Sequence, residues 1–435
     1  MAAVAAADQD DGDLADVFVQ GGRSQTDEPD YVGLESIDRA CLEIYPDQPN
    51  PLQATAVVKL WLGGPDPLDY ISMYSNPGDP DRAILPHWHY VSYGFSDLHG
   101  DNRVHPISGP GQPSGFGFEL SFRLKKEDDQ SVPPMWPSNL MNKLATYVFQ
   151  TGNVLQVGDH IPWHCPLDGG GNSQIQHMLI TSDPQLPDLD TLIGYVQFRQ
   201  IVGVKDDELK AAQRWKGAGV LELMCTVKEI SPYFITDMSR TRSIFEMDSN
   251  LLHQVTTGIE QDGSNLGHVT AVCSWTEMSA GPVFEREADM VTQTPSGDVM
   301  DTGDDTVTLC PPETLEAVHL KFDAEAAELL PLIVKARLQK GRFFVFHNAE
   351  NYAIHLIPPS CQEDNLFVSQ GEPLKAQSTF LQIYCSEILI DKMSQEFEML
   401  QDSFEENQHY PIEFRFSDPT IVITVSPRGQ LYCDL

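Results

Sequence analysis

The mixed order of strand-like and helix-like segments is the feature that most constrains this fold. Residues 87–95 (HWHYVSYGF) and 115–124 (GFGFELSFRL) alternate aromatic or aliphatic residues with small or polar ones, which is typical of half-buried strands. Apolar residues at a helical spacing in 34–45 predict a helix that Pro46 ends. Because strands and helices follow no regular βαβ alternation, the pattern favours an α+β fold.

The other local patterns predict further elements of both kinds. We expect the strands 87–95 and 115–124 to be neighbours in a sheet, with a helix from Ser138 to Gly152 packed on it. Ser138 is predicted to cap this helix, because a serine oxygen can accept a hydrogen bond from a free helical N–H group. Helices are also predicted at 206–215, 220–224, 329–338 and 386–400, and strands at 269–275, 316–322, 342–346, 380–384 and 421–425.

The length of the chain predicts more than one domain. Its 435 residues exceed what one hydrophobic core usually organises, so we expect two lobes, at 31–265 and 266–435, each a mixed β-sheet with packed helices. Residues 1–30, rich in Ala, Asp and Gly, are predicted to be a disordered acidic arm. A stretch of acids, Gly, Pro, Ser and Thr predicts a disordered acidic loop at about 279–313.

The acidic composition narrows the classes of partner. With 64 acidic against 27 basic groups, the formal net charge is −37. Such a chain repels phosphate backbones and anionic lipid surfaces, so direct nucleic-acid or membrane binding is not expected. A basic protein partner would be attracted, although the simpler interpretation is that the acidic excess aids solubility.

Cysteine spacing and the N-terminal segment favour a reducing, intracellular location. The eight cysteines are far apart and form no CxxC pair, so neither a disulfide framework nor a zinc finger is expected. The N-terminus lacks the basic flank and apolar stretch of a signal peptide, and no apolar run approaches the roughly 20 residues of a membrane helix.

Two clusters of reactive side chains are candidates for catalytic or metal sites. His87 and His89 lie on one side of a predicted strand and could hold a metal if a third ligand arrived, but histidines hydrogen-bonded beside aromatic residues are the more ordinary interpretation. His164 and Cys165 could form a nucleophile pair only if the fold placed thiol against imidazole, and adjacent residues of an extended segment point apart. The sequence therefore predicts no catalytic residue, no metal and no cofactor.

Several long segments resemble one known family. They are YPDQPNPLQATAVVKLWLGGPDPLDYISMY (45–74), HWHYVSYGFSDLHGDNRVH (87–105) and SGFGFELSFRL (114–124), followed by shorter strings such as GDHIPWHCPLD (158–168) and DGSNLGHVTAVCSW (262–275). These resemble the Suppressor of fused family, and the likeness covers nearly all of residues 34–346.

The resemblance implies a non-catalytic negative regulator of Hedgehog signalling, cytoplasmic and nuclear, that binds Gli/Ci transcription factors. Its two lobes would close around a short Ser-Tyr-Gly-His-apolar motif, which adds as a β-strand in the cleft between the lobes. Main-chain hydrogen bonds give affinity in this mode and side-chain pockets give specificity. Two alternatives stay open: a general pathway scaffold for kinases such as Fused, and a cysteine hydrolase that uses Cys165.

The same resemblance implies which residues contact the partner peptide. Tyr147, Leu155 and Asp159 correspond to positions that line the cleft on the N-terminal lobe. The C-terminal lobe would contribute an edge strand and an apolar wall, through Val269, Ala271 and Leu320. The family's vertebrate members carry a much longer loop where this chain has 285–313, so regulation through that loop is not expected to carry over.

Overall fold

The computed structural model describes residues 19–20, 32–278, 311–362, 365–400 and 409–431. The chain divides into two compact units, unit 1 (1–258) and unit 2 (259–435), whereas the sequence predicted a boundary at 265/266. Most of the predicted acidic arm 1–30 and of the predicted loop 279–313 lies outside the described residues. However, the backbone of Val19–Gln20 (β1) forms a short strand within the predicted arm, and Glu313–Thr314 (β12) forms another where the predicted loop ends.

Unit 1 contains helices and strands in mixed order. Its strands after β1 are Leu52–Thr55 (β2), Tyr70–Asn76 (β3), His87–Tyr93 (β4), Pro113–Lys125 (β5), His160–Pro162 (β6), His177–Ser182 (β7), Leu189–Thr191 (β8) and Gly194–Val204 (β9). Its helices are Val32–Ile44 (α1), Trp136–Thr151 (α2), Asp206–Arg214 (α3), Gly217–Met224 (α4), Ile244–Met247 (α5) and Ser249–Asp262 (α6), with 3₁₀ turns at Leu60–Leu62 and Pro80–Arg82. The division between the units falls within α6.

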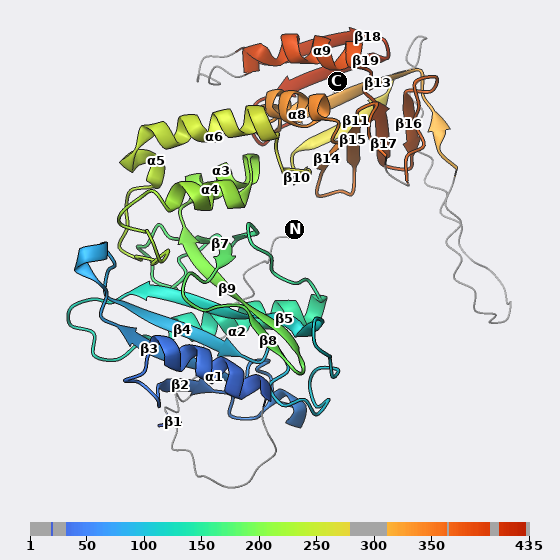
Figure 1. Cartoon of the computed structure of the whole chain (residues 1–435). Coiled ribbons are helices and arrows are strands. Elements are labelled where there is room, and N and C mark those ends of the chain that lie inside the picture. The colour runs from blue at the N-terminus through green and yellow to red at the C-terminus, as the bar shows by residue number, and fades with distance from the viewer. Residues whose placement is uncertain (1–18, 21–31, 279–310, 363–364, 401–408, 432–435) are drawn as a thin grey trace, which may run out of the picture. The chain divides into compact units, whose positions relative to one another are not determined.

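One nine-stranded sheet organises unit 1. The strand order is β1-β2-β3-β4-β5-β9-β7-β6, with β8 paired to β9 (Figure 1). The strands β4 and β5 are antiparallel neighbours, with His89 opposite Arg123, which confirms the predicted pairing. The strands β5 and β9 are parallel, and their register shifts between Pro113 and Phe118. The shift makes a bulge in β5 beside the first part of β9.

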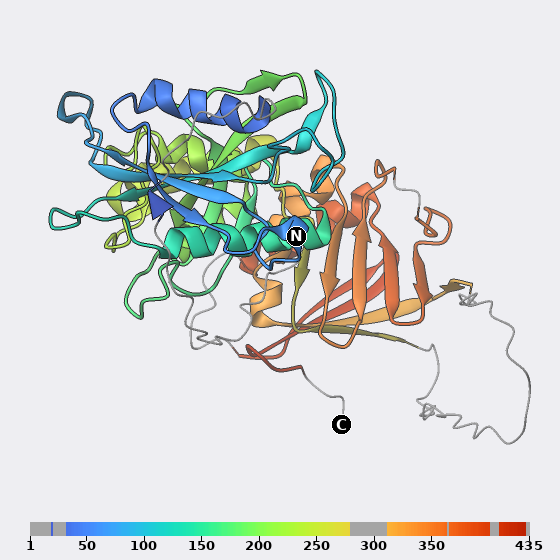
Figure 2. The same ribbon diagram turned by 90° about the horizontal axis from the view of Figure 1, so that it is seen from below.

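The helices α1 and α2 lie on opposite faces of this sheet (Figure 2). Each helix contributes to a separate apolar cluster, which explains why both faces are covered. On the α2 face, Leu140, Leu144 and Val148 pack against the apolar side of β5. On the α1 face, Ile37 and Cys41 pack near Tyr93 of β4. The strands are therefore buried on both sides, unlike the half-buried strands that the alternating pattern predicted.

The predicted capping role of Ser138 is wrong. The helix α2 begins at Trp136, so Ser138 lies inside the first turn, after Met135 in the capping position. Its hydroxyl is buried and has no hydrogen-bond partner within the described residues. The C-terminal end is as predicted: Gly152 adopts a left-handed conformation with φ 72° and its N–H group bonds to the Val148 carbonyl.

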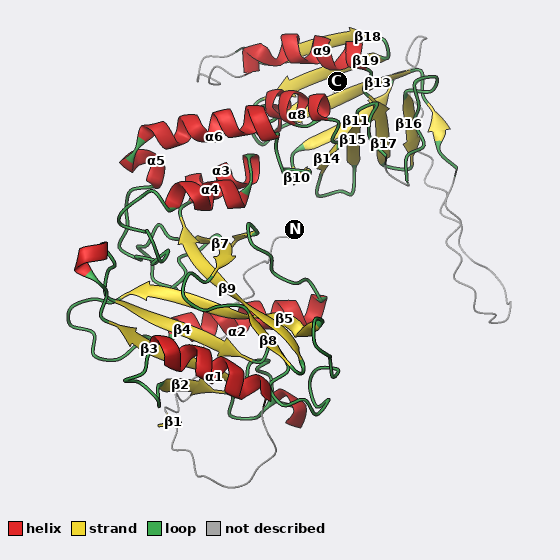
Figure 3. Ribbon diagram, in the orientation of Figure 1, coloured by secondary structure: helices red, strands yellow, loops and turns green. Residues whose placement is uncertain are grey.

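Unit 2 contains two sheets rather than the one that the sequence predicted. The six-stranded sheet has the order β10-β14-β15-β17-β16-β12, and the four-stranded sheet has the order β11-β13-β19-β18 (Figure 3). The strands are His268–Thr270 (β10), Cys273–Glu277 (β11), Ala317–Asp323 (β13), Phe344–His347 (β14), Ala353–Ile357 (β15), Leu374–Gln377 (β16), Phe380–Tyr384 (β17), Ile412–Ser417 (β18) and Thr420–Ser426 (β19). The helices are Ala324–Ala327 (α7), Leu330–Ala336 (α8) and Glu387–Glu396 (α9), with 3₁₀ turns at Leu338–Lys340 and Phe397–Leu400.

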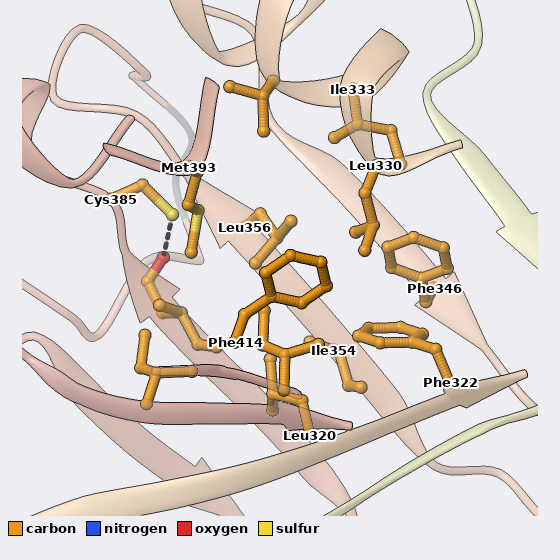
Figure 4. Packing of buried hydrophobic residues seen from close by; sticks show 14 of the residues in the cluster. Leu320, Phe322, Leu330, Ile333, Phe346, Ile354, Leu356, Cys385, Met393 and Phe414 are labelled. Carbon is orange, nitrogen blue, oxygen red and sulfur yellow. Dashed lines mark hydrogen bonds between the residues drawn. The ribbon is translucent and has the colours of Figure 1, made fainter. Parts of the chain in front are cut away.

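Most of the buried apolar side chains that the structure describes in unit 2 belong to one core. Side chains from both sheets and from α8 and α9 meet in it, among them Leu320, Phe346, Ile354, Met393 and Phe414 (Figure 4). The predicted strand 269–275 is wrong in one respect, because it is broken into β10 and β11, which belong to different sheets. In the part of the chain that the structure describes, no helix is long and apolar enough to cross a bilayer.

Candidate functional site: an open sheet edge and a loop beside a pocket

The strand β10 forms one edge of the six-stranded sheet in unit 2. It runs parallel to β14, with Val269 opposite Phe346. The Gly267 carbonyl accepts a hydrogen bond from the Val345 N–H group at 3.1 Å, and the Ala271 N–H group donates to the His347 carbonyl at 2.7 Å. Successive residues of a strand direct their backbone groups to opposite sides, so Gly267, Val269 and Ala271 bond to β14.

The alternate residues of β10 face the other way. By the same alternation, the backbone groups of His268 and Thr270 point to the outer side of the strand, where no described strand is paired with β10. Both side chains are exposed. An unpaired row of backbone donors and acceptors of this kind can accept a further strand.

The three predicted contact residues of unit 2 are less exposed than a binding role suggests. Val269 and Ala271 are partly buried and pack against the apolar core, so they set the position of the edge. Leu320 lies on β13, an interior strand of the other sheet, and is 1% exposed. Its side chain points into the core (Figure 4), which leaves almost no surface for the apolar wall that the resemblance implied.

The three predicted contact residues of unit 1 lie at the end of α2 and in the loop that follows. The Tyr147 ring is partly buried, and its hydroxyl accepts a hydrogen bond from the Asn153 side chain at 2.9 Å. Gly152 turns the chain back, and Leu155 then enters the α2-side core, where it is 2% exposed. The loop is therefore held by packing on one side and leaves its polar groups outside.

Asp159 ends this loop and gives the loop a negative charge. Its carboxylate accepts a hydrogen bond from the Gln156 N–H group at 2.8 Å, and its own N–H group donates to the Gln156 carbonyl at 3.0 Å. Partial burial raises the pKa of Asp159, while the Gln156 N–H group and nearby His160 act in the opposite direction. A carboxylate that is partly stripped of water gains from a cationic partner more than a fully hydrated one does.

A pocket of about 240 Å³ adjoins the loop in unit 1. Its walls come from the bulged start of β5, from the loop after α2 and from β9, and its lining residues are Pro113, Phe116, Gly117, Phe118, Val154, Leu155, Gln156, Tyr195, Gln197 and Arg199. The bulge has a clear local cause, since Gly117 has φ 79°, a conformation that side chains disfavour. An added Cβ there would lie 2.9 Å from Pro113 and 3.2 Å from the Tyr195 ring.

The structure thus brings Tyr147, Leu155 and Asp159 together within unit 1, and Val269 and Ala271 within unit 2. The expectation that both groups face one cleft stays a prediction, because each unit is described by itself. Three further residues that line the pocket, Tyr195, Gln197 and Arg199, were not predicted from the sequence. The signal was present as a period of two along 194–204, which places these three side chains on one face of a strand.

His87 and His89, the two candidate metal ligands, belong to a buried hydrogen-bond network. His89 is fully buried and lies 3.0 Å from the Tyr45 hydroxyl and 3.1 Å from Asp183. Arg123 lies 3.2 Å from His87 and donates to Asp183 at 2.8 Å. Burial, followed by the charge of Arg123, lowers the pKa of His87 to about 3 and that of His89 to about 4. Both rings are therefore neutral near pH 7, and the ordinary interpretation accounts for them.

The proposed thiol nucleophile has no imidazole aligned with it. His164 is exposed and has φ 62°, and its ring stacks edgewise on His177 with centroids 5.1 Å apart. His177 accepts the Trp163 N–H group at 3.1 Å through Nδ1. No hydrogen bond among the described residues joins the Cys165 thiol to either ring. Across all residues that the structure describes, no group of three or more His, Cys, Asp or Glu side chains could hold a metal ion.

Comparison with known proteins identifies the family. The family model described as Suppressor of fused protein matches residues 64–241, and the one described as Suppressor of Fused Gli/Ci N terminal binding domain matches 289–425. The human and mouse proteins named Suppressor of fused homolog are each 41% identical to this chain, over 91% of it and 92% of the relative.

Two solved structures agree with these matches. The crystal structure of Drosophila Suppressor of Fused has a TM-score of 0.74 and 34% identity, over 91% of this chain and 97% of that one. A chain from a Sufu–Fu complex has a TM-score of 0.50 and 48% identity, over 52% of this chain and 97% of that one. By sequence and by its α+β fold, this chain belongs to the Suppressor of fused family.

Proposed function

We propose that this protein is a non-catalytic negative regulator of Hedgehog signalling that binds Gli/Ci transcription factors through a short peptide motif. It retains them in the cytoplasm and represses their activity, in the nucleus as well. The family model that matches 289–425 is described as a Gli/Ci binding domain, which supports this partner. The regulatory character of the family supports a binding role rather than a chemical one.

The open edge of β10 is the observation that carries the proposal. It offers the backbone groups of His268 and Thr270 to an incoming strand, beside Val269 and Ala271, which fix the edge against the core. A peptide that pairs there gains main-chain hydrogen bonds of about 0.5–1.5 kcal/mol each. This mode needs an extended segment and no cofactor.

Asp159 supplies charge selectivity in the same proposal. A histidine in the motif would be favoured in its protonated form beside this partly desolvated carboxylate. A charge-assisted hydrogen bond of this kind contributes about 1.5–3 kcal/mol. The proposed site therefore combines strand pairing on unit 2 with a charged contact on unit 1.

Calorimetric titration with a Ser-Tyr-Gly-His-Leu peptide tests the proposal. We expect Asp159→Arg to weaken binding by at least about tenfold, because an attractive charge becomes a repulsive one. Glu229→Arg, at an exposed acid of unit 1, is the matched control for the same change in net charge. Equal affinities of wild type and Asp159→Arg would reject the role of Asp159.

Backbone pairing has a separate test. A series of peptides, each N-methylated at one residue, removes one backbone donor at a time and keeps the side chains. Because only every second residue of a strand bonds to a given neighbour, methylation should abolish binding at every second position and be tolerated at the positions between. Equal tolerance at every position would contradict strand addition. Scattering profiles with and without peptide test whether the units close around it, and identical profiles would reject closure.

A scaffold role is the second candidate, supported by one observation. A chain solved in a Sufu–Fu complex is 48% identical to the corresponding 52% of this protein. If Fused binds elsewhere on this chain, the Asp159→Arg variant should lose Gli in a pull-down and keep the kinase.

The cysteine hydrolase alternative predicts labelling of Cys165 by thiol-directed activity probes. Peptide binding without such labelling would reject this alternative.

A further inference from the structure

Arg199 differs from the other buried arginines among the described residues. Four arginines are at most 9% exposed, and they are Arg123, Arg199, Arg240 and Arg337. Three of them have their charge or their donors satisfied inside the protein. Arg123 pairs with Asp183, Arg240 pairs with Glu208 through both nitrogens of its fork, and the three side-chain nitrogens of Arg337 donate to backbone carbonyls.

Arg199 has only neutral and incomplete contacts. One terminal nitrogen donates to the Ser182 hydroxyl at 3.4 Å, and the other donates to the side-chain carbonyl of Gln197. Its Nε atom is buried and has no partner within the described residues, and no carboxylate there forms an ion pair with it. Leaving a buried charge unpaired is costly, so such a group usually serves a function.

The surroundings of Arg199 form a receptacle for a ligand. Arg199 lines the 240 Å³ pocket, whose other walls include Phe116, Phe118 and Leu155. Gln156, Tyr195 and Gln197 also line it, so a buried cation stands among apolar and neutral polar groups, which suits a carboxylate carried on a short stem. Burial lowers the pKa of Arg199, and Asp188, Tyr195 and Asp159 partly offset this effect.

We infer that this pocket is an anion-binding subsite that takes the carboxylate of an acidic residue in the bound partner segment. The inference rests on the proposed function, because the pocket is continuous with the Asp159 loop through Leu155 and Gln156. A free anion is disfavoured by the net charge of −37. A carboxylate on a segment already held by strand pairing avoids this penalty through its high effective concentration.

The subsite gives the candidate site two charges of opposite sign. Asp159 selects a cationic side chain, and Arg199 selects an acidic residue at a fixed distance from it along the partner. Burial raises the pKa of Asp159 and lowers that of Arg199, and the charge of each group partly offsets this effect on the other. The inferred partner segment is therefore dipolar rather than simply basic.

A glutamate scan of the motif's flanks tests this inference. Ser-Tyr-Gly-His-Leu peptides with three added residues on each side carry one Glu in place of Gln at each flanking position in turn. We expect one register to bind wild type at least about tenfold more tightly with Glu than with Gln. The difference should vanish in Arg199→Gln and persist in the control Arg214→Gln, which removes an exposed positive charge.

The melting temperature of the Arg199→Gln variant distinguishes a binding role of Arg199 from a structural one. Because no carboxylate of the described residues forms an ion pair with Arg199 and its Nε atom has no partner there, Arg199→Gln should leave the melting temperature unchanged or raise it. A loss comparable to that of Arg123→Met would assign Arg199 a structural role and overturn the inference. So would motif binding without any glutamate effect, or a glutamate effect that survives in Arg199→Gln. Failure of the motif peptide to bind wild type would instead overturn the proposed function itself.

Discussion

The two units bury different kinds of side chain. Beneath α1, the sheet of unit 1 encloses a polar network around Arg123 and Asp183, and nearby it encloses Glu119, which accepts hydrogen bonds from the backbone of Gly94 and Ser96. Unit 2 is built around one continuous apolar core (Figure 4). Unit 1 therefore depends on directional contacts as well as on its two apolar clusters, whereas unit 2 depends mainly on apolar area and close packing.

This difference predicts which kind of substitution destabilises each unit most. A buried ion pair gains little over an apolar replacement of equal shape, but removal of one partner leaves the other charge without compensation. An apolar core loses stability in proportion to the volume removed and tolerates changes that conserve volume. The same substitution class should consequently have unequal effects in the two units.

The largest expected effect follows from neutralising Asp183 in unit 1. Asp183→Asn keeps the shape of the side chain but leaves Arg123 fully buried without its carboxylate. We expect a loss of about 3–5 kcal/mol in the free energy of unfolding. Hydrogen exchange should locate the loss in β5 and β9, and the exposed Asp190→Asn is the control. A loss below about 1 kcal/mol in the free energy of unfolding would contradict the view that unit 1 depends on its buried ion pair.

Truncation of Leu320 probes the apolar core of unit 2. Leu320→Ala removes a side chain that is 1% exposed and should cost about 2–5 kcal/mol. Denaturant unfolding, followed by exchange in β13 and β19, measures this loss, and Ile388→Ala, at a position 66% exposed, should cost far less. Weakened peptide binding with unchanged stability would instead support Leu320 as a contact residue.

Acid should destabilise unit 1 through its buried histidines. The pKa of His89 is about 4 in the folded state against an ordinary 6.5, so between these values the unfolded chain binds more protons. Stability is therefore lost as pH falls from 6.5 towards 4, by about 1.4 kcal/mol per pH unit for one histidine. His89→Gln should flatten this slope, and the exposed His253→Gln should not. Unchanged slopes in both variants would mean that His89 is charged when folded.

The smallest effect concerns a single hydroxyl. Since Ser138 is buried without a partner, Ser138→Ala should leave stability unchanged or slightly raise it. Ser243 is a true cap, accepting the Glu246 N–H group in a reciprocal pair, so Ser243→Ala should cost about 1 kcal/mol. Comparable losses in both variants, measured by thermal unfolding, would restore the capping role that the sequence assigned to Ser138.

Local patterns in the sequence were sufficient for several elements. The predicted helix 34–45 corresponds to α1, and the predicted strand 316–322 corresponds to β13. The pairing of β4 with β5 also followed from their patterns. The break between β10 and β11 did not, because Ala271 and Val272 have strand-forming neighbours on both sides and only the competing sheets separate them.

The predicted site residues came from the resemblance, and their role in binding stays a prediction. The resemblance pointed to Tyr147 and Asp159, and the structure adds that Tyr147 lies near the end of α2 and Asp159 in the loop that follows, where Leu155 and Gln156 line a pocket. The sequence did not show that the Leu320 side chain is 1% exposed, since an apolar residue in a sequence carries no mark of its burial. Arg199 was not found, because a sequence shows a charge but not whether anything neutralises it.

By itself, the sequence determined the mixed α+β class, the family and most of the regular elements, since all of these depend on short-range periodicity or on long shared strings. Only the tertiary structure decided which strand is an edge, which charges are paired and which side chains are buried. These properties depend on residues distant in the chain, such as Arg123 and Asp183, whose energetic meaning arises when folding excludes water around them.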